Sequence, residues 1–149
     1  MAFESSVDID ASPETLFDLT QDYGRRLEWD PYLKEARLVD ADVAAHGARA
    51  WCVAKTTGLG METQYVSFKR PQTAAINMTR GPFFLSRFAG SWNFKALASG
   101  QTRVVFRYHI ETRPKWLQFL LMPVVGWVFA RDSARRLAAL KTFVEGQVS

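Results

Sequence analysis

The stretch FESSVDIDASPETLFDLT, residues 3–20, runs from a strand pattern straight into the start of a helix. Apolar and polar residues alternate over residues 3–10, which is the period of a half-buried β-strand. Ser12 is a favourable N-cap residue and Pro13 suits the first position of a helix. We therefore expect the chain to open with a strand and then a capped helix over residues 13–20.

The long middle of the chain is patterned for β-strands. A short helical turn over residues 25–28 should end before Pro31, because a proline disfavours a helical residue ahead of it. Beyond that turn, strand-like segments alternate with short runs rich in turn-forming residues, at the spacing of an antiparallel meander. The expected strands span residues 34–42, 49–57, 61–69, 73–79, 87–97 and 102–112.

The last two expected strands indicate which side chains face the core. In the final strand, Tyr108 falls on the apolar side of the alternation and His109 on the polar side. The inward set of that strand is Val104, Phe106, Tyr108 and Ile110. The preceding strand carries a matching aromatic row of Phe88, Trp92 and Phe94. We expect these side chains to form one apolar surface inside the protein.

The C-terminal part of the chain is patterned for a basic amphipathic helix, with apolar residues at spacings of three and four. Its expected inward side carries Ala130, Ala134, Leu137, Leu140 and Val144. This element order predicts an α+β fold, in which a curved sheet wraps around one long C-terminal helix. Such an architecture readily encloses an apolar cavity, so the sequence favours binding of a hydrophobic small molecule.

A separate question is raised by the run from Trp116 to Ala130, which is almost entirely apolar. It is shorter than the roughly 20 residues of a membrane span, and polar or helix-disfavouring residues interrupt it, so we reject a transmembrane helix. Two alternatives remain: a buried cover for the sheet, which we favour, or an interfacial segment that makes peripheral membrane contact. The basic residues that flank the run are Arg113, Lys115 and Arg131.

Composition is that of a globular protein. The 149 residues include 48% hydrophobic and 13% aromatic side chains, and the formal charge is +4. That charge is modest and spread along the chain, so it permits an anionic ligand and does not indicate nucleic acid. With a single cysteine, Cys52, and no signal peptide pattern, we expect one cytoplasmic domain over residues 1–149.

Several segments together resemble one known family. They are IDASPETLFDL at residues 9–19, the positions Asp22, Trp29 and Pro31, GQTRV at residues 100–104, and LAALKTFVE at residues 137–145. In order and spacing they are similar to the polyketide cyclase/dehydrase and lipid-transport family (SRPBCC) of the START-like, Bet v 1-like superfamily. The resemblance implies a helix-grip fold: a seven-stranded antiparallel sheet around the C-terminal helix, with two short helices between strands one and two. It also implies a cavity that holds sterols, lipids, polyketides, hormones or quinones in different members.

Signatures of catalysis are few. The chain contains no HExxH, CxxC, GxSxG or P-loop motif, and we expect neither a metal nor another cofactor. His109 should face solvent, and Cys52 should pack within a strand rather than react. Tyr108 is the one weak catalytic candidate, because a phenol on an apolar face must find a hydrogen-bond partner or orient a ligand atom.

We therefore expect a protein that binds a lipid, quinone or polyketide-like compound between the sheet and the C-terminal helix. The expected ligand-binding residues are Trp29, Phe88, Trp92, Phe94, Phe106, Tyr108, Ile110, Trp127 and Leu137. One alternative is an aromatase/cyclase in which Tyr108 and an arginine polarise a poly-keto chain, which predicts a polar cluster deep in the cavity. Two others are a quinone or membrane-interface accessory protein, and a filled core with no cavity. The sequence does not indicate the oligomeric state.

Overall fold

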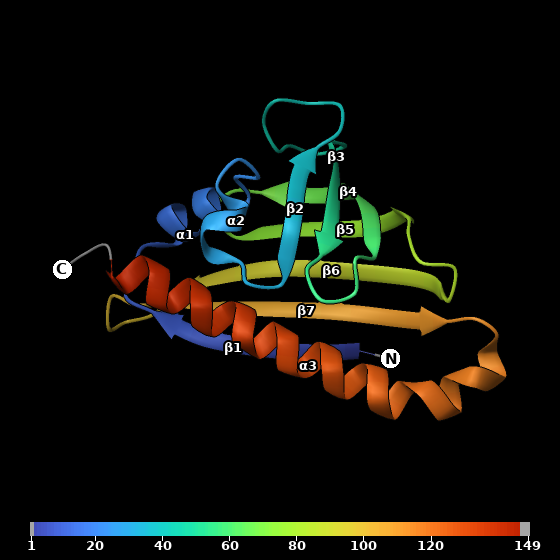
Figure 1. Ribbon diagram of the computed structural model, residues 1–149. Coiled ribbons are helices and arrows are strands. Elements are labelled where there is room, and N and C mark those ends of the chain that lie inside the picture. The colour runs from blue at the N-terminus through green and yellow to red at the C-terminus, as the bar shows by residue number, and fades with distance from the viewer. Residues whose placement is uncertain (1, 147–149) are drawn as a thin grey trace.

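The computed structural model describes residues 2–146, apart from the side chains at positions 115, 117 and 122. This part of the chain forms one seven-stranded antiparallel sheet and three helices (Figure 1). In chain order the elements are β1 (Ala2–Ile9), α1 (Pro13–Thr20), α2 (Arg26–Trp29), β2 (Leu33–Leu38), β3 (Arg49–Ala54), β4 (Gly60–Lys69), β5 (Thr73–Arg80), β6 (Leu85–Ala96), β7 (Thr102–Thr112) and α3 (Lys115–Gly146). The α+β arrangement, with two short helices between β1 and β2, confirms the prediction.

The sheet is strongly curved, and the curvature sets the place of α3. Its strand order is β1-β7-β6-β5-β4-β3-β2, so the first strand pairs with the last. Register shifts interrupt the pairing of β2 with β3, β4 with β5, and β6 with β7, and such irregularities bend and twist strands. Figure 1 shows β2 and β3 turned steeply against β6 and β7, with α3 crossing the concave side.

Helix α1 forms for the reasons that its sequence suggests. The Ser12 hydroxyl accepts a hydrogen bond from the Thr15 backbone N–H at 3.2 Å, and Pro13 occupies the first turn. The side chains of Leu16, Phe17 and Leu19 on this helix are buried in the hydrophobic core. The predicted bounds of this helix are confirmed.

Helix α3 joins the predicted final helix and the apolar run ahead of it into one element that contains Pro123. Its buried side carries Gly126, Ser133, Leu137, Leu140 and Val144. Ala130 and Ala134 are exposed, so the predicted inward side was wrong at these two positions. The reason is a close approach to β1: a Cβ at Gly126 would lie 2.9 Å from the ring of Phe3. That contact fixes the rotation of the helix about its axis.

The favoured prediction of a buried cover for residues 116–130 is wrong for most of the run. Five large apolar residues there are more than half exposed: Trp116, Phe119, Leu120, Val124 and Trp127. Because Gly126 faces Phe3 near the start of β1, the turns of α3 ahead of Gly126 extend past that end of the strand, as Figure 1 shows. No strand among residues 2–146 lies beneath them to cover their side chains.

Candidate functional site

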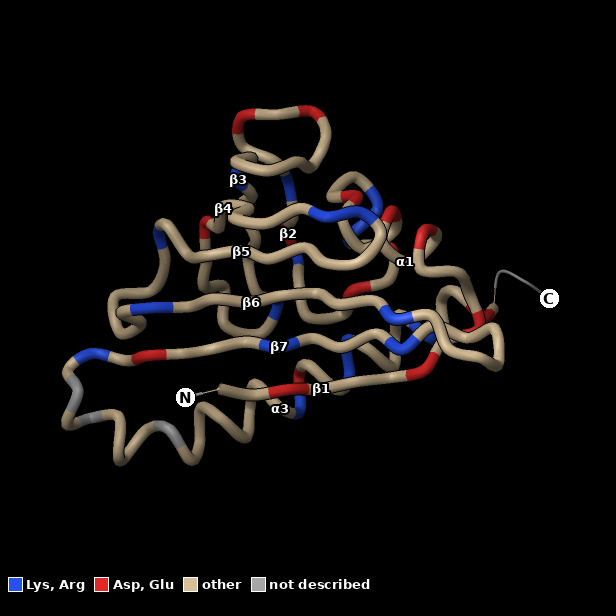
Figure 2. The backbone as a smooth tube through the Cα atoms, turned by 180° about the vertical axis from the view of Figure 1, so that it is seen from behind, with Lys and Arg blue, Asp and Glu red and all other residues tan. Residues whose placement is uncertain are grey.

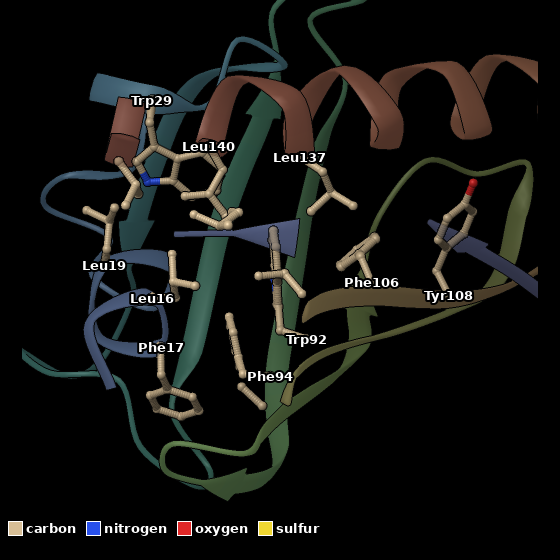
Figure 3. Close-up of a cluster of buried hydrophobic side chains, with 14 of the residues drawn as sticks. Leu16, Phe17, Leu19, Trp29, Trp92, Phe94, Phe106, Tyr108, Leu137 and Leu140 are labelled. Atoms are coloured by element: carbon tan, nitrogen blue, oxygen red, sulfur yellow. The ribbon is translucent and has the colours of Figure 1, made fainter. Parts of the chain in front are cut away.

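The concave side of the sheet carries a continuous row of aromatic rings, which Figure 3 shows from β6 and β7. Tyr108 stacks on Phe3 with ring centroids 5.1 Å apart, and lies 5.6 Å from Phe106. Phe106 in turn lies 4.9 Å from Trp92, which stacks on Phe94 at 6.4 Å. The predicted facing of both strands is confirmed, and the rings make an apolar floor beneath α3.

The structure brings eight of the nine predicted ligand-binding residues together around this floor. Seven of them are buried in the central cluster: Trp29, Trp92, Phe94, Phe106, Tyr108, Ile110 and Leu137. Phe88 is partly buried and packs against the same cluster. Trp127 is the exception, because the residue before it, Gly126, is the one that meets β1. Trp127 therefore points outward and is 63% exposed, so its predicted place at the site is wrong.

A buried cluster of charged groups stands at one end of the aromatic row. Asp30, at the end of α2, is 3% exposed, and its Oδ2 atom lies 2.9 Å from Nε of Arg26 and 3.0 Å from Nε of Arg136. Its other oxygen accepts a hydrogen bond from the Tyr32 backbone N–H at 3.0 Å. Arg26 also donates to the Thr20 carbonyl at 2.9 Å. Two guanidinium groups thus share one carboxylate, so these three groups together carry one positive charge. The carboxylate of Asp132 on α3 is a further negative charge that acts on the neighbouring Tyr32 and Tyr108.

Aromatic faces surround both guanidinium groups. Arg26 lies 5.0 Å from the ring centre of Trp29 and 5.5 Å from that of Trp92. Arg136 lies 4.9 Å from the ring of Tyr32 and 5.8 Å from that of Phe106. Cation–π attraction is stronger where water is excluded, so these rings help to hold the charges in place. The charged cluster and the aromatic row therefore form one continuous site.

The charges also determine the protonation states within the site. Burial works to raise the pKa of Asp30, but the guanidinium groups of Arg136 and Arg26 outweigh it and lower that pKa overall. Burial likewise opposes the charge on Arg26, whose pKa is nevertheless raised by the Asp30 carboxylate. Asp30 and Arg26 are accordingly both charged at neutral pH.

Some polar groups at this site lack partners within the described part of the chain. They are Nε1 of Trp29 and the hydroxyl of Tyr108. The Tyr108 side chain extends towards the side where α3 passes (Figure 3). Burial raises its pKa, although the nearby Ser133 hydroxyl lowers it in part, so the phenol stays protonated at neutral pH. Buried polar groups are normally paired, so these atoms are candidate contacts for a ligand.

His109 and Cys52, the other two residues with reactive side chains that the sequence analysis discussed, do not contribute to this site. His109 faces away from α3, with Nε2 3.9 Å from the Glu111 carboxylate, as its parity predicted. Burial raises the pKa of the Cys52 thiol, which disfavours the reactive thiolate. Among residues 2–146, no three His, Cys, Asp or Glu side chains are placed to hold a metal ion together.

Two surface hollows have no lining residue from α3, although one of them includes Phe3 and Tyr108 of the aromatic row. One, of about 590 Å³, opens between α1 and the β2–β3 connection, with Asp18, Tyr23 and Val43 among its lining residues. The other, of about 490 Å³, lies across the outer face of the sheet and includes Val66 and His109. The aromatic rings beneath α3 instead contact one another, so a ligand there must separate rings that are packed in this structure.

Sequence reasoning missed the charged cluster. None of Arg26, Asp30 and Arg136 was among the residues that the sequence predicted for the site. One signal was present: Arg26 and Asp30 are four residues apart, at the spacing of a helical ion pair. The spacing of Ser133, Arg136 and Leu140 would also have placed Arg136 on the buried side of α3, once the helix rotation was known.

Comparison with known proteins agrees with the fold described above. A family model described as polyketide cyclase / dehydrase and lipid transport matches residues 1–145. No curated protein sequence matches the chain. Among solved structures, TTHA0849 from Thermus thermophilus has a TM-score of 0.83 at 18% identity, with 100% of both chains covered.

Two further structures have the same fold. The Zhui aromatase/cyclase from Streptomyces sp. R1128 has a TM-score of 0.80 at 16% identity, covering 100% of this chain and 96% of that one. Ara h 8.0201 has a TM-score of 0.75 at 16% identity, covering 98% of each chain. These likenesses establish the Bet v 1-like helix-grip fold, and at such identities they establish the fold alone.

Proposed function

Because the chain belongs to the polyketide cyclase/dehydrase and lipid transport family, we propose that it binds a hydrophobic small molecule with an acidic or oxygen-rich end. The apolar body of the ligand would lie along the aromatic row beneath α3. Its polar end would meet the buried guanidinium group of Arg136. The observation that carries this proposal is the pair of arginines on the single carboxylate of Asp30.

The aromatic row supports the apolar half of the proposal. Phe88 and Phe129 are partly buried rings that lie 6.2 Å apart, one on β6 and the other on α3. They connect the buried rings of the row to the solvent-accessible edge of the site. A flat, greasy ligand that enters between them would be held by the same ring contacts that these side chains now make with each other. Its affinity would rise with the apolar area that leaves water.

The charged cluster supports the polar half. One carboxylate does not neutralise two guanidinium groups, so an anionic group would complete the charge balance. Planar guanidinium groups bind carboxylates with two parallel hydrogen bonds, and such charge-assisted bonds are the stronger ones in proteins. Nε1 of Trp29 and the Tyr108 hydroxyl add neutral donors, which suit a carbonyl or phenol oxygen.

The second candidate function is aromatase/cyclase chemistry. An enzyme of this kind is expected to have a polar cluster deep in its site, and the buried cluster of Arg26, Asp30 and Arg136 is the observation in its favour. Tyr108 is protonated at neutral pH, so it can donate a hydrogen bond to an enolate oxygen but does not act as a base. Arg136 can stabilise the same developing charge. No described histidine faces this site, since His109 lies on the outer side of the sheet and His46 in the β2–β3 connection. Binding is accordingly the better supported function.

The proposal is tested with two fluorescent probes that share one ring system. The first is 8-anilinonaphthalene-1-sulfonate, which is anionic, and the second is N-phenyl-1-naphthylamine, which lacks the sulfonate. The wild-type protein is expected to bind the anionic probe more tightly. Arg136→Met should weaken anionic binding about tenfold or more and leave neutral binding nearly unchanged, since charge-assisted hydrogen bonds contribute about 1.5–3 kcal/mol.

The matched control is Arg103→Met, which removes an exposed arginine from the outer side of β7, away from both the aromatic row and α3. It should leave the affinity for both probes unchanged. Arg136→Met keeps Asp30 paired with Arg26, so circular dichroism should show that the variant folds. Equal losses in the two variants, or no loss in Arg136→Met, would contradict the proposed site.

A further inference from the structure

The first half of α3 presents large apolar side chains to solvent. We call Trp116, Phe119, Leu120, Val124 and Trp127 the α3 stripe. Phe119 shows most clearly that the surface is uncovered. It lies seven residues ahead of Gly126 and so falls on the helix side that packs on β1 further along, yet it is 88% exposed. Soluble surfaces rarely carry so many large apolar residues in one place, and such a patch marks an interaction site.

A sixth exposed large apolar side chain lies at the same end of the molecule. Phe83, in the β5–β6 connection, is 86% exposed. Its neighbour Phe84 accepts a hydrogen bond from the backbone N–H of Arg113 at 2.9 Å, and the Arg113 side chain donates to the Leu85 carbonyl at 3.1 Å. These bonds hold the β5–β6 connection against the start of α3. Phe83 therefore lies at the same end as the α3 stripe.

The charges around this surface are positive. No acidic residue occurs in the sequence between Glu111 and Asp132. Arg113 lies at one end of the stripe, and Arg131 and Arg135 continue the outward side of α3 at the other. Arg131 lies 5.0 Å from the ring centre of Trp127 and 3.6 Å from a carboxylate oxygen of Asp132. In Figure 2, basic positions (blue) lie at the same end of the sheet, near the end of β7 and the start of β6, where one acidic position (red) on β7 also lies: Glu111, 3.9 Å from Arg87.

We propose that the α3 stripe docks on a bilayer that contains anionic phospholipids, with the helix lying in the interface and not crossing it. No helix in the described part of the chain is long and apolar enough to cross a membrane. Exposed large apolar side chains, tryptophans at both ends of the stripe and arginines at its border are properties of helices that lie in a membrane interface. The arginines would meet lipid phosphates while the rings enter the acyl boundary.

Charge also argues against a second copy of the chain as the occupant. A two-fold symmetric interface brings the same patch of both copies together, so the arginines that border one stripe would face those of the other. Like charges across an interface oppose association, whereas anionic headgroups complement them. The proposal is independent of the ligand between sheet and helix, since it uses a different surface.

The test is flotation of the full chain with vesicles of phosphatidylcholine, either alone or with phosphatidylglycerol added. The wild-type protein should float with the anionic vesicles. A Phe119→Ser, Leu120→Ser double variant should lose about a hundredfold in partition coefficient, because each of the two buried large apolar side chains contributes about a factor of ten. The matched control is Val43→Ser, in the β2–β3 connection, where a valine 76% exposed lies outside the stripe.

A second variant tests the charges. Arg131→Gln with Arg135→Gln should bring binding to anionic vesicles down to the level seen with phosphatidylcholine alone, as added salt should. Light scattering on a sizing column reports self-association of the same proteins. Vesicle binding that is unchanged in the double serine variant overturns the proposal. A wild-type dimer that the double serine variant converts to monomer, without any vesicle binding, overturns it as well and assigns the stripe to a second copy.

Discussion

Nε of Arg136 on α3 lies 3.0 Å from Oδ2 of Asp30 at the end of α2, so a buried charge pair ties the C-terminal helix to the small helices. The same oxygen lies 2.9 Å from Nε of Arg26. Both contacts are sheltered from water by Trp29, Tyr32 and the aromatic row. The groups proposed to recognise the ligand therefore also contribute to the stability of the fold, and the two roles can be separated by substitution.

Asp30→Asn should destabilise the protein strongly. The amide leaves two buried guanidinium groups without a counter-charge, and such changes cost about 3–5 kcal/mol in free energy of unfolding. Urea denaturation measures the effect. Asp18→Asn is the control: Asp18 pairs with Arg70 at 2.7 Å on the surface, and exposed pairs contribute about 1 kcal/mol or less. Equal destabilisation by the two substitutions would contradict the importance of the buried cluster.

The stability of the wild-type protein should depend on pH through the same carboxylate. The pKa of Asp30 is lowered from 3.8 in the folded state, so its ionised form stabilises the fold above that value, and the contribution is lost as the pH falls through the folded pKa. Asp30→Asn lacks this contribution at every pH. The difference in urea midpoint between the two proteins should therefore shrink below about pH 4. A constant difference down to acid pH would refute this assignment.

Two buried tyrosines should respond in opposite ways to loss of the hydroxyl. The Tyr65 hydroxyl donates to Oε1 of Gln21 at 2.6 Å, whereas that of Tyr108 has no hydrogen-bond partner of standard geometry in the described chain. Tyr65→Phe should lower the free energy of unfolding by about 1–2 kcal/mol, and Tyr108→Phe should leave it unchanged or raise it slightly. Thermal or urea unfolding distinguishes them. A large loss in Tyr108→Phe would show that its hydroxyl is already bonded in the ligand-free protein.

Gly126→Leu should weaken the contact between α3 and β1. A Cβ at this position would lie 2.9 Å from the ring of Phe3, which is itself stacked on Tyr108. We expect a loss of about 1–3 kcal/mol in free energy of unfolding, as for other overpacked sites. Gly146→Ala, at the end of the same helix with open space around its Cβ position, should be neutral or slightly stabilising. Wild-type stability in Gly126→Leu would show that α3 can shift away from β1 without cost.

Much of the fold could be predicted because its signals are local. The cap at Ser12, the alternation in β7 and the turns between strands each depend on a few neighbouring residues. The rotation of α3 is not local. Apolar residues cover both sides of its first half, so hydrophobic periodicity does not define an inward side, and the contact of Gly126 with Phe3 decides it. The prediction for Trp127 failed for that reason.

The candidate site was predicted only in its apolar part. Strand alternation was sufficient to place Trp92, Phe106 and Tyr108 on one surface. The charged cluster joins α2 to α3 across more than a hundred residues of sequence, and only folding shows that Arg136 meets Asp30. A buried arginine cannot be distinguished from a solvated one by composition, since most arginines are exposed.

The most direct test of the central claim is an NMR titration of the five tryptophan indole N–H signals with 8-anilinonaphthalene-1-sulfonate. The signals are assigned with single Trp→Phe variants. If the ligand lies beneath α3 and reaches the charged cluster, the signals of Trp29 and Trp92 should shift in a saturable manner. Those of Trp116 and Trp127, on the outer side of α3, should stay in place. Shifts confined to Trp116 and Trp127 would contradict a binding site between the sheet and the helix.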